Sequence, residues 1–199
     1  MKNIIIGMAV SAIAFNACNN SSNKSEDTQS IKTDSDTATQ TQPDFPVNTE
    51  VKATVSIEEI VTAYLQLKNA FTKDNTNDVA TAGTTLETAF KTFDKITLTA
   101  EQKRKFEDLE DDAREHAEHI GANGGNIKHQ REHFELLSKD MYDLVKAFGA
   151  GQVLYKDFCP MYNNNKGAFW ISETKEISNP YLGKEMPKCG IVKEEIKYK

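Results

Sequence analysis

The sequence predicts a mainly helical protein: an up-and-down four-helix bundle with an irregular, short-strand C-terminal segment packed on it. Three observations lead to this prediction. Apolar residues recur at helical spacing in four consecutive segments between residues 57 and 148. Capping residues or glycines separate those segments, and the connections are short, as between antiparallel neighbours. Beyond Gly151 the helical period stops, and short apolar runs alternate with Pro, Asn and Gly.

The first two helices have clear sequence limits. A capping box at Ser56-Ile57-Glu58-Glu59 is expected to start the first helix, whose apolar stripe runs from Ile57 to Phe71. The polar run at 74–77, Asp-Asn-Thr-Asn, ends that helix and caps the second. The stripe of the second helix runs from Val79 to Phe93.

The third and fourth helices form a hairpin around a glycine-rich turn. Thr99-Ala100-Glu101-Gln102 is a capping box before the stripe from Phe106 to Ile120, and Gly121 is expected to stop that helix. Asn126 is expected to cap the fourth helix, whose stripe runs from Ile127 to Phe148. After it, the apolar runs at 153–155, 168–171 and 191–192 predict short strands or extended segments.

The N-terminal residues predict export and lipid anchoring. Lys2, an apolar run from Ile4 to Phe15 and a small residue before Cys18 are typical of a bacterial lipoprotein signal, with Cys18 as the acylated residue. An ordinary cleaved signal is the alternative. We therefore expect a signal peptide at 1–17, the lipidated cysteine with a flexible polar linker at 18–52, and one domain at 53–199.

This organisation predicts a location and excludes one class of partner. The expected place is the bacterial cell envelope, with the protein held to a membrane by its N-terminal lipid and the domain in the periplasm. The formal net charge of the chain is −6. An acidic chain of this kind lacks the basic surface that phosphate backbones require, so nucleic acid is not an expected partner.

Two sulfur pairs in the C-terminal segment are the first candidate site. Cys159 and Met161 are two residues apart, and Met186 and Cys189 form a near mirror image of that pair. Thiols and thioethers are soft donors that select Cu(I) and, by the same softness, Ag(I). A disulfide between Cys159 and Cys189 is the structural alternative, since exported proteins live in an oxidising compartment. Inert free thiols are the third reading.

All four histidines fall within residues 116–133 and form the second candidate site. His116 and His119 lie near the end of the third helix, and His129 and His133 near the start of the fourth, so that each pair shares a helical face. Helical phase places His116 and His133 at the edges of the apolar stripes and directs His119 and His129 toward solvent. The pattern allows a partial metal site from His116 and His133, or plain surface histidines. Imidazole suits Zn(II), Cu(II) and Ni(II).

Beside these histidines, Gln130 falls on the apolar side of its helix. A buried amide needs hydrogen-bond partners, and we expect Gln130 to bond the C-terminal segment.

The chain resembles a known group of proteins at two places. The residues concerned are the run 129–134, His-Gln-Arg-Glu-His-Phe, and the ordered set Cys159-Pro160-Met161, Gly167, Trp170-Ile171-Ser172, Ile177, Asn179-Pro180-Tyr181, Gly183, Met186 and Cys189-Gly190. In these it resembles the bacterial domain of unknown function 3347 family, a domain also found on periplasmic adaptor (membrane fusion) proteins of copper/silver efflux pumps. The resemblance implies handling of a soft metal in the envelope. The chain lacks the long body of the adaptors.

The functional expectation is a non-catalytic lipoprotein that binds copper or silver for buffering or hand-over to efflux components. The expected ligands are Cys159, Met161, Met186 and Cys189, with His133 and His116 next. No hydrolase or oxidoreductase constellation is recognised, so the chain is not expected to be an enzyme. The alternative is a non-catalytic interaction module of an envelope complex, held together by a structural Cys159–Cys189 disulfide.

Overall fold

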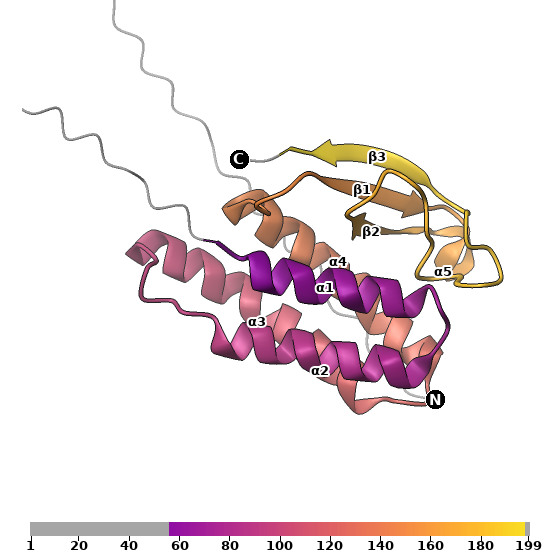
Figure 1. The fold of residues 1–199 in the computed structure, drawn as a ribbon, viewed down its shortest axis with the longest axis horizontal. Coiled ribbons are helices and arrows are strands. Elements are labelled where there is room, and N and C mark those ends of the chain that lie inside the picture. Colours follow the sequence, from indigo (N-terminus) through magenta and orange to yellow (C-terminus); the bar gives the residue numbers. More distant parts are fainter. Residues whose placement is uncertain (1–55, 198–199) are drawn as a thin grey trace, which may run out of the picture. The chain divides into compact units, whose positions relative to one another are not determined.

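Four long helices follow the four apolar stripes and pack in chain order (Figure 1). The computed structural model describes residues 56–197, which lie in one compact unit, Thr49–Lys199. Its helices are α1 (Glu58–Phe71), α2 (Thr76–Thr92), α3 (Ala100–Ala122) and α4 (Ile127–Phe148). Helix α1 packs on α2, α2 on α3, and α3 on α4. The predicted bundle is therefore confirmed.

Three of the expected helix starts are confirmed by the capping contacts. The side chain of Asn75 accepts main-chain N–H groups in the first turn of α2, and Asn126 does the same for α4. Thr99 and Gln102 form the reciprocal capping box of α3. These contacts satisfy N–H groups that have no partner inside the helix, which is why polar residues precede each stripe.

The expected capping box of α1 is wrong. Ile57 takes the N-cap position, where it makes no side-chain cap bond. Ser56 Oγ accepts only the nearby N–H of Glu58, at 3.3 Å. The apolar side chain of Ile57 is buried in the core, and this packing places it at the helix start instead of the serine.

The expectation that Gly121 stops α3 is also wrong, since α3 continues through it to Ala122. Gly121 is instead a point of close approach between α2 and α3. A Cβ on Gly121 would lie 2.7 Å from Thr84 Oγ1, and a Cβ on Gly83 would lie 2.8 Å from the main-chain N of Gly121. The two glycines let the helices approach more closely than side chains would allow.

We expect Gly83→Ala to lower the free energy of unfolding by about 1–3 kcal/mol, although alanine is the better helix former. The added methyl group would collide with the α3 main chain, which cannot move aside as a flexible side chain does. Chemical denaturation measures the change. Gly124→Ala is the matched control, because its Cβ would meet no atom closer than 3.5 Å. A Gly83→Ala variant as stable as the wild type would contradict the close approach.

The C-terminal segment forms a small antiparallel sheet of strand order β2-β1-β3. Its elements are β1 (Leu154–Cys159), the short helix α5 (Tyr162–Asn165), β2 (Ala168–Ser172) and β3 (Ile191–Ile196). Each apolar run that predicted a strand lies wholly or partly in one of these strands. The central strand β1 pairs with β2 through Asp157 opposite Trp170, and with β3 through Phe158 opposite Ile191.

The sheet packs on the helices through β2, which lies against α4 and α1 (Figure 1). Tyr64 of α1 connects the layers, because its hydroxyl contacts Ser138 Oγ at 2.9 Å and accepts the main-chain N–H of Ile171 at 3.1 Å. These two contacts give the buried phenol hydroxyl its hydrogen-bond partners. Burial raises the pKa of Tyr64 above its usual value.

The predicted signal peptide at 1–17, the lipid attachment at Cys18 and the linker that follows fall in residues 1–55, outside the described residues. Within the part of the chain that is described, no helix has both the length and the hydropathy needed to cross a membrane.

Candidate functional site

The two thiols meet at the end of the sheet. Cys159 is the last residue of β1 and is fully buried, while Cys189 lies in the turn before β3 and is half-buried. Their Sγ atoms are 3.5 Å apart and both cysteines are free. Antiparallel pairing of β1 with β3, with Phe158 opposite Ile191, brings these distant residues together. The thiols are therefore placed as a pair by the strand register.

Trp170 lies close to Gly190, the residue that follows Cys189. Gly190, next to Cys189, has a φ of +155°, and a Cβ there would lie 3.0 Å from the Trp170 ring. Ala168 stands opposite Cys159 in the β1–β2 register and leaves room beside it. The Trp170 Nε1 atom is buried and has no hydrogen-bond partner in the described chain. The Cys159 thiol is thus fully buried, whereas the Cys189 thiol is partly open to solvent.

The two methionines adjoin the thiols through their main chains. The N–H of Cys189 donates to the carbonyl of Met186 at 3.1 Å, and the Met161 side chain is 48% exposed.

Burial and the adjacent Cys159 thiol raise the pKa of Cys189, against an opposing hydrogen bond from the Met161 main chain. Cys189 is therefore held as a thiol, which argues against a nucleophilic role.

The thiol pair fits a two-sulfur metal centre in its donor chemistry and separation. A soft ion bound about 2.3 Å from each sulfur spans up to about 4.6 Å between them. The observed 3.5 Å lies inside that span, so small side-chain rotations suffice. The metal must displace the thiol protons, and its affinity therefore depends on pH.

Asn179 fixes the turn that presents Cys189. Its side-chain amide donates to the Cys189 carbonyl at 2.6 Å, and its main-chain N–H donates to the carbonyl of Pro187 at 2.9 Å. Its Oδ1 accepts the N–H groups of Tyr181 and Leu182. One buried amide therefore sets the backbone on both sides of the thiol.

Arg131 and Asp74 attach the same segment to the bundle. Arg131 Nε donates to the carbonyl of Pro180 at 2.9 Å, and its guanidinium pairs with Asp74. The other Asp74 oxygen accepts the main-chain N–H of Lys184 at 2.8 Å. Burial opposes ionisation of Asp74, but the Lys184 N–H and Arg131 together hold the pKa of this carboxyl below its usual value.

The expected partner of Gln130 is wrong. Gln130 is fully buried, but its amide donates to the carbonyls of Thr76 and Ile120 and accepts the Thr76 hydroxyl. It therefore connects α4 to α2 and α3. The neighbouring Arg131 makes the bond to the C-terminal segment, because one residue along a helix turns the side chain by about 100°.

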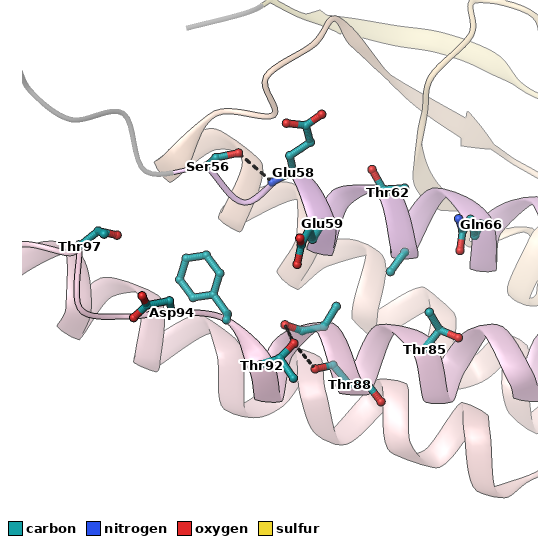
Figure 2. A pocket seen from close by; sticks show the side chains of 13 residues that line it. Ser56, Glu58, Glu59, Thr62, Gln66, Thr85, Thr88, Thr92, Asp94 and Thr97 are labelled. Carbon is teal, nitrogen blue, oxygen red and sulfur yellow. Dashed lines mark hydrogen bonds between the residues drawn. The ribbon is translucent and has the colours of Figure 1, made fainter.

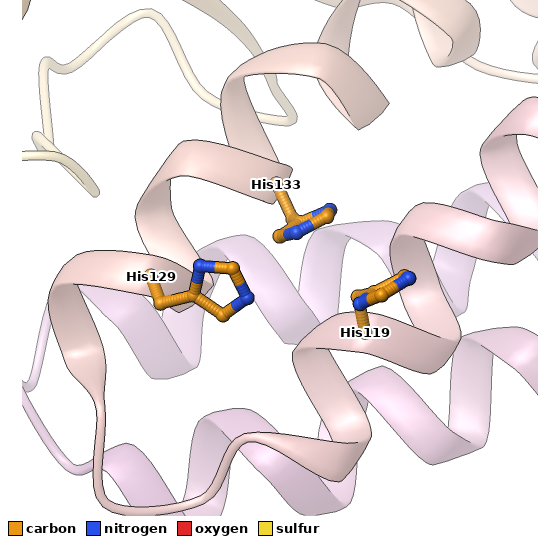
Figure 3. Close-up of side chains that lie close together, drawn as sticks. All are labelled: His119, His129 and His133. Atoms are coloured by element: carbon orange, nitrogen blue, oxygen red, sulfur yellow. The ribbon is translucent and has the colours of Figure 1, made fainter.

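The four histidines converge between α3 and α4. His119, His129 and His133 each offer a ring nitrogen, and these three atoms lie within 4.8 Å of one another (Figure 3). His116 Nδ1 lies 3.2 Å from His133 Nδ1. His119 and His129 are partly exposed to solvent, as expected, but their convergence with His133 was not expected. They lie at the rim of the helix pair and turn toward each other across it.

Burial and acidic neighbours shape this imidazole cluster. Burial is the first cause that lowers the pKa of both His116 and His133, and the other histidines lower that of His133 further. Carboxylates flank the cluster, with Glu115 3.7 Å from His119 and Glu132 3.4 Å from His129. At neutral pH the inner rings are neutral and offer lone pairs.

The imidazole cluster and the thiol pair occupy different elements. The histidines stand on α3 and α4, whereas the thiols belong to β1 and the turn before β3. Within residues 56–197, no hydrogen bond or ring contact joins a histidine to Cys159, Met161, Met186 or Cys189. The structure brings His116 and His133 together as a separate group.

A cleft between α1 and α2 has a volume of about 1010 Å³ (Figure 2). Threonines dominate its wall, and the hydroxyls of Thr85, Thr88 and Thr92 already bond the carbonyls one turn earlier. Its described lining contains no histidine or cysteine. The described part of the cleft therefore offers carboxylates, among them Glu58 and Glu59, but no imidazole or thiol.

A buried charged group beneath the sheet was not foreseen from the sequence. Lys68 of α1 is buried and pairs with Glu173 at 2.7 Å. Asp157 of β1 is fully buried, and neither of its oxygens has a hydrogen-bond partner among the described residues. The one available signal was the β1 alternation, which puts Asp157 on the same inward face as Cys159.

Fold and side-chain clusters define a class: a helical-bundle domain with a C-terminal sheet, a thiol pair and an imidazole cluster. Residues 60–153 match the family described as "Protein of unknown function (DUF3347)", and through this segment the chain belongs to that family. The match includes all four histidines and ends before β1, so the thiol pair lies outside it. No curated protein and no solved structure matches the chain.

Proposed function

We propose that this protein binds a soft monovalent metal ion, Cu(I) or Ag(I), through Cys159 and Cys189. It would act in the bacterial cell envelope, anchored by a lipid on Cys18, and buffer the metal or hand it to an efflux system. The observation that carries the proposal is the 3.5 Å separation of two free thiols at the end of the sheet.

The chemistry of the surroundings supports a soft ion over a hard one. Thiolates are soft donors, and the full burial of Cys159 favours neutralisation of its charge by a bound cation. Met161 is exposed beside the pair, where a flexible thioether is suited to pass an ion in and out. Met186 adjoins through the turn. His133 and His116 are assigned to the separate imidazole cluster and are not used here.

The resemblance to domains on copper/silver efflux adaptors supports an envelope role in metal handling. The contacts that hold the C-terminal segment to the bundle also explain how the two thiols stay next to each other. Asn179 and Arg131 hold the turn that carries Cys189, so that its thiol stays opposite Cys159 without a covalent link. The bundle would then serve as the rigid support of the site.

Cu(I) competition titration of reduced protein against a chromophoric chelator should give one tightly bound ion per chain. The Cys159→Ser, Cys189→Ser double variant should bind at least about 100-fold more weakly, because serine hydroxyls are poor ligands for a soft ion. Met161→Leu should weaken binding less. Met141→Leu, at a buried position in α4, is the matched control and should leave binding unchanged. Equal Cu(I) affinity in the double variant would overturn the proposal.

The same separation supports a second candidate, an interaction module with a structural disulfide. Closing the pair to about 2.05 Å would make a disulfide that fastens the turn before β3 to β1. Intact mass of native protein before and after thiol alkylation distinguishes the two. A mass two hydrogens below the reduced form, with no alkylation, favours the disulfide; two alkylated thiols that Cu(I) protects favour the metal.

A further inference from the structure

We propose that the imidazole cluster is a second metal site, for a divalent ion of borderline softness such as Zn(II) or Cu(II). His119, His129 and His133 are its ligands. His116 and Asp140 position His133 and do not touch the metal. The site differs from the thiol pair in its elements, its donor type and the charge of the ion that it selects.

The three ligands lie close together, but their rings must rotate to share an ion, because His119 and His133 are stacked at an interplanar angle of 3° and their lone pairs lie in parallel planes. A divalent ion bound 2.0–2.1 Å from each ring nitrogen requires those nitrogens about 3.3 Å apart in a tetrahedral site. The three nitrogens lie within 4.8 Å of one another, with the rings of His119 and His133 stacked at 4.4 Å (Figure 3). The side chains of His119 and His129 are 45% and 36% exposed, so both rings have room to rotate toward a common ion.

The third ligand is held in place by a chain of polar contacts. Asp140 Oδ2 lies 3.9 Å from His116 Nε2, and His116 Nδ1 lies 3.2 Å from His133 Nδ1. One set of tautomers fits this order: His133 donates from Nδ1 to His116 Nδ1, and His116 carries its own proton on Nε2, which is too far from Asp140 for a hydrogen bond at 3.9 Å. The Nε2 lone pair of His133 is then directed to the metal. Partners that fix the second ring nitrogen in this way are typical of metal-bound histidines.

The buried oxygen of Asp140 is a second indication that this series of polar contacts supports a bound metal. Its Oδ2 is buried and lacks a hydrogen-bond partner among the described residues, which is costly for a carboxylate. A metal on His133 polarises the ring and strengthens each hydrogen-bond donation behind it. The orphaned oxygen would then gain the His116 proton as a partner.

The groups around the imidazole cluster favour a cation that can be taken up and released. Glu115 and Glu132 stand beside the two outer ligands, and their negative charge favours a bound cation. Three protein ligands leave one coordination position open to water, unlike the closed four-ligand sites that stabilise folds. The site is therefore expected to take up and release its ion, without a structural role in the already packed α3–α4 pair.

The test uses the untagged full chain with every free cysteine alkylated, so that thiols make no contribution. Isothermal titration with Zn(II), and separately with Cu(II), should show one ion per chain. His119→Gln should weaken binding more than His116→Gln, for which a loss of roughly 10–100-fold is expected of a positioning residue. Glu107→Gln, an exposed change on α3, is the control and should bind as the wild type does.

Electron paramagnetic resonance of the Cu(II) form separates ligands from positioning residues. His119→Gln should lose one nitrogen from the hyperfine pattern, whereas His116→Gln should keep the wild-type number. Circular dichroism confirms that each variant is folded. Absence of one-to-one binding to alkylated protein, or affinity unchanged in His119→Gln, overturns this inference and leaves the Cu(I) proposal standing. If instead Cu(I) binding fails while the histidines still bind the divalent ion, the Cu(I) proposal is overturned and this inference stands.

Discussion

Between about pH 4.5 and pH 8, Asp157→Asn should become more stable relative to the wild type by roughly 3 kcal/mol. Burial is the main cause that raises the pKa of Asp157 to about 7 from 3.8, while Lys68 opposes the rise and Glu173 adds to it. The whole shift corresponds to roughly 4 kcal/mol, most of which falls within this range of pH.

The sign follows from proton binding. Between the unfolded and folded pKa values of Asp157 the native state holds more protons than the unfolded state, so stability falls as pH rises from 3.8 to about 7. Below that window both states are protonated and the wild type has no penalty. An asparagine does not titrate and lacks this loss.

Urea denaturation of metal-free wild type and variant at a series of pH values measures the difference. Other titrating groups are common to the two proteins and cancel when the two free energies of unfolding are subtracted. Asp140, whose pKa burial raises to about 6, is one such group. A difference that stays constant with pH would show that the Asp157 carboxyl reaches water or an unseen partner.

Arg131→Met should lower the free energy of unfolding by about 2–4 kcal/mol, somewhat less than the loss of a fully buried pair. The Arg131 side chain is 13% exposed, and its removal leaves Asp74 Oδ1 and the carbonyl of Pro180 without this donor. The C-terminal segment that carries Cys189 would then be held to α4 less firmly. Arg131→Lys should recover only part of the loss, since an ammonium cannot make the same set of bonds.

Guanidinium chloride denaturation measures this change, and amide hydrogen exchange at Lys184, whose N–H bonds Asp74, reports the segment directly. Lys139→Met is the matched control on the same helix, because its pair with Glu135 is exposed. The control should change stability by less than about 0.5 kcal/mol. If Arg131→Met behaves like Lys139→Met, the pair with Asp74 does not hold the segment.

Much of the fold was predictable because its signals are local. The apolar stripes, the caps at Asn75, Thr99 and Asn126, and the three short strands each depend on residues close in sequence. The errors also have local causes. Glycine often ends a helix, but Gly121 lies where α2 and α3 approach closely, and a Cβ there would lie 2.7 Å from Thr84 Oγ1.

The candidate sites were predictable in residue type and less so in geometry. The stripes placed His119 and His129 toward solvent, where they are partly exposed, but did not show that they meet, because phase within one helix says nothing of what its neighbour presents. Positions that flank the apolar seam of one helix face the flanking positions of the next, and long side chains meet there. For the same reason, the predicted hydrogen-bond partner of Gln130 was wrong.

The sequence by itself determined the four helices, the short strands, the soft and imidazole donors and their order along the chain. Only the tertiary structure decided that Cys159 and Cys189 lie 3.5 Å apart, that the histidines form their own cluster, and that Asp157 is buried without a partner. Periodicity reports the burial of each segment separately. Distances between segments depend on strand register and helix packing, which arise only when the whole chain is folded.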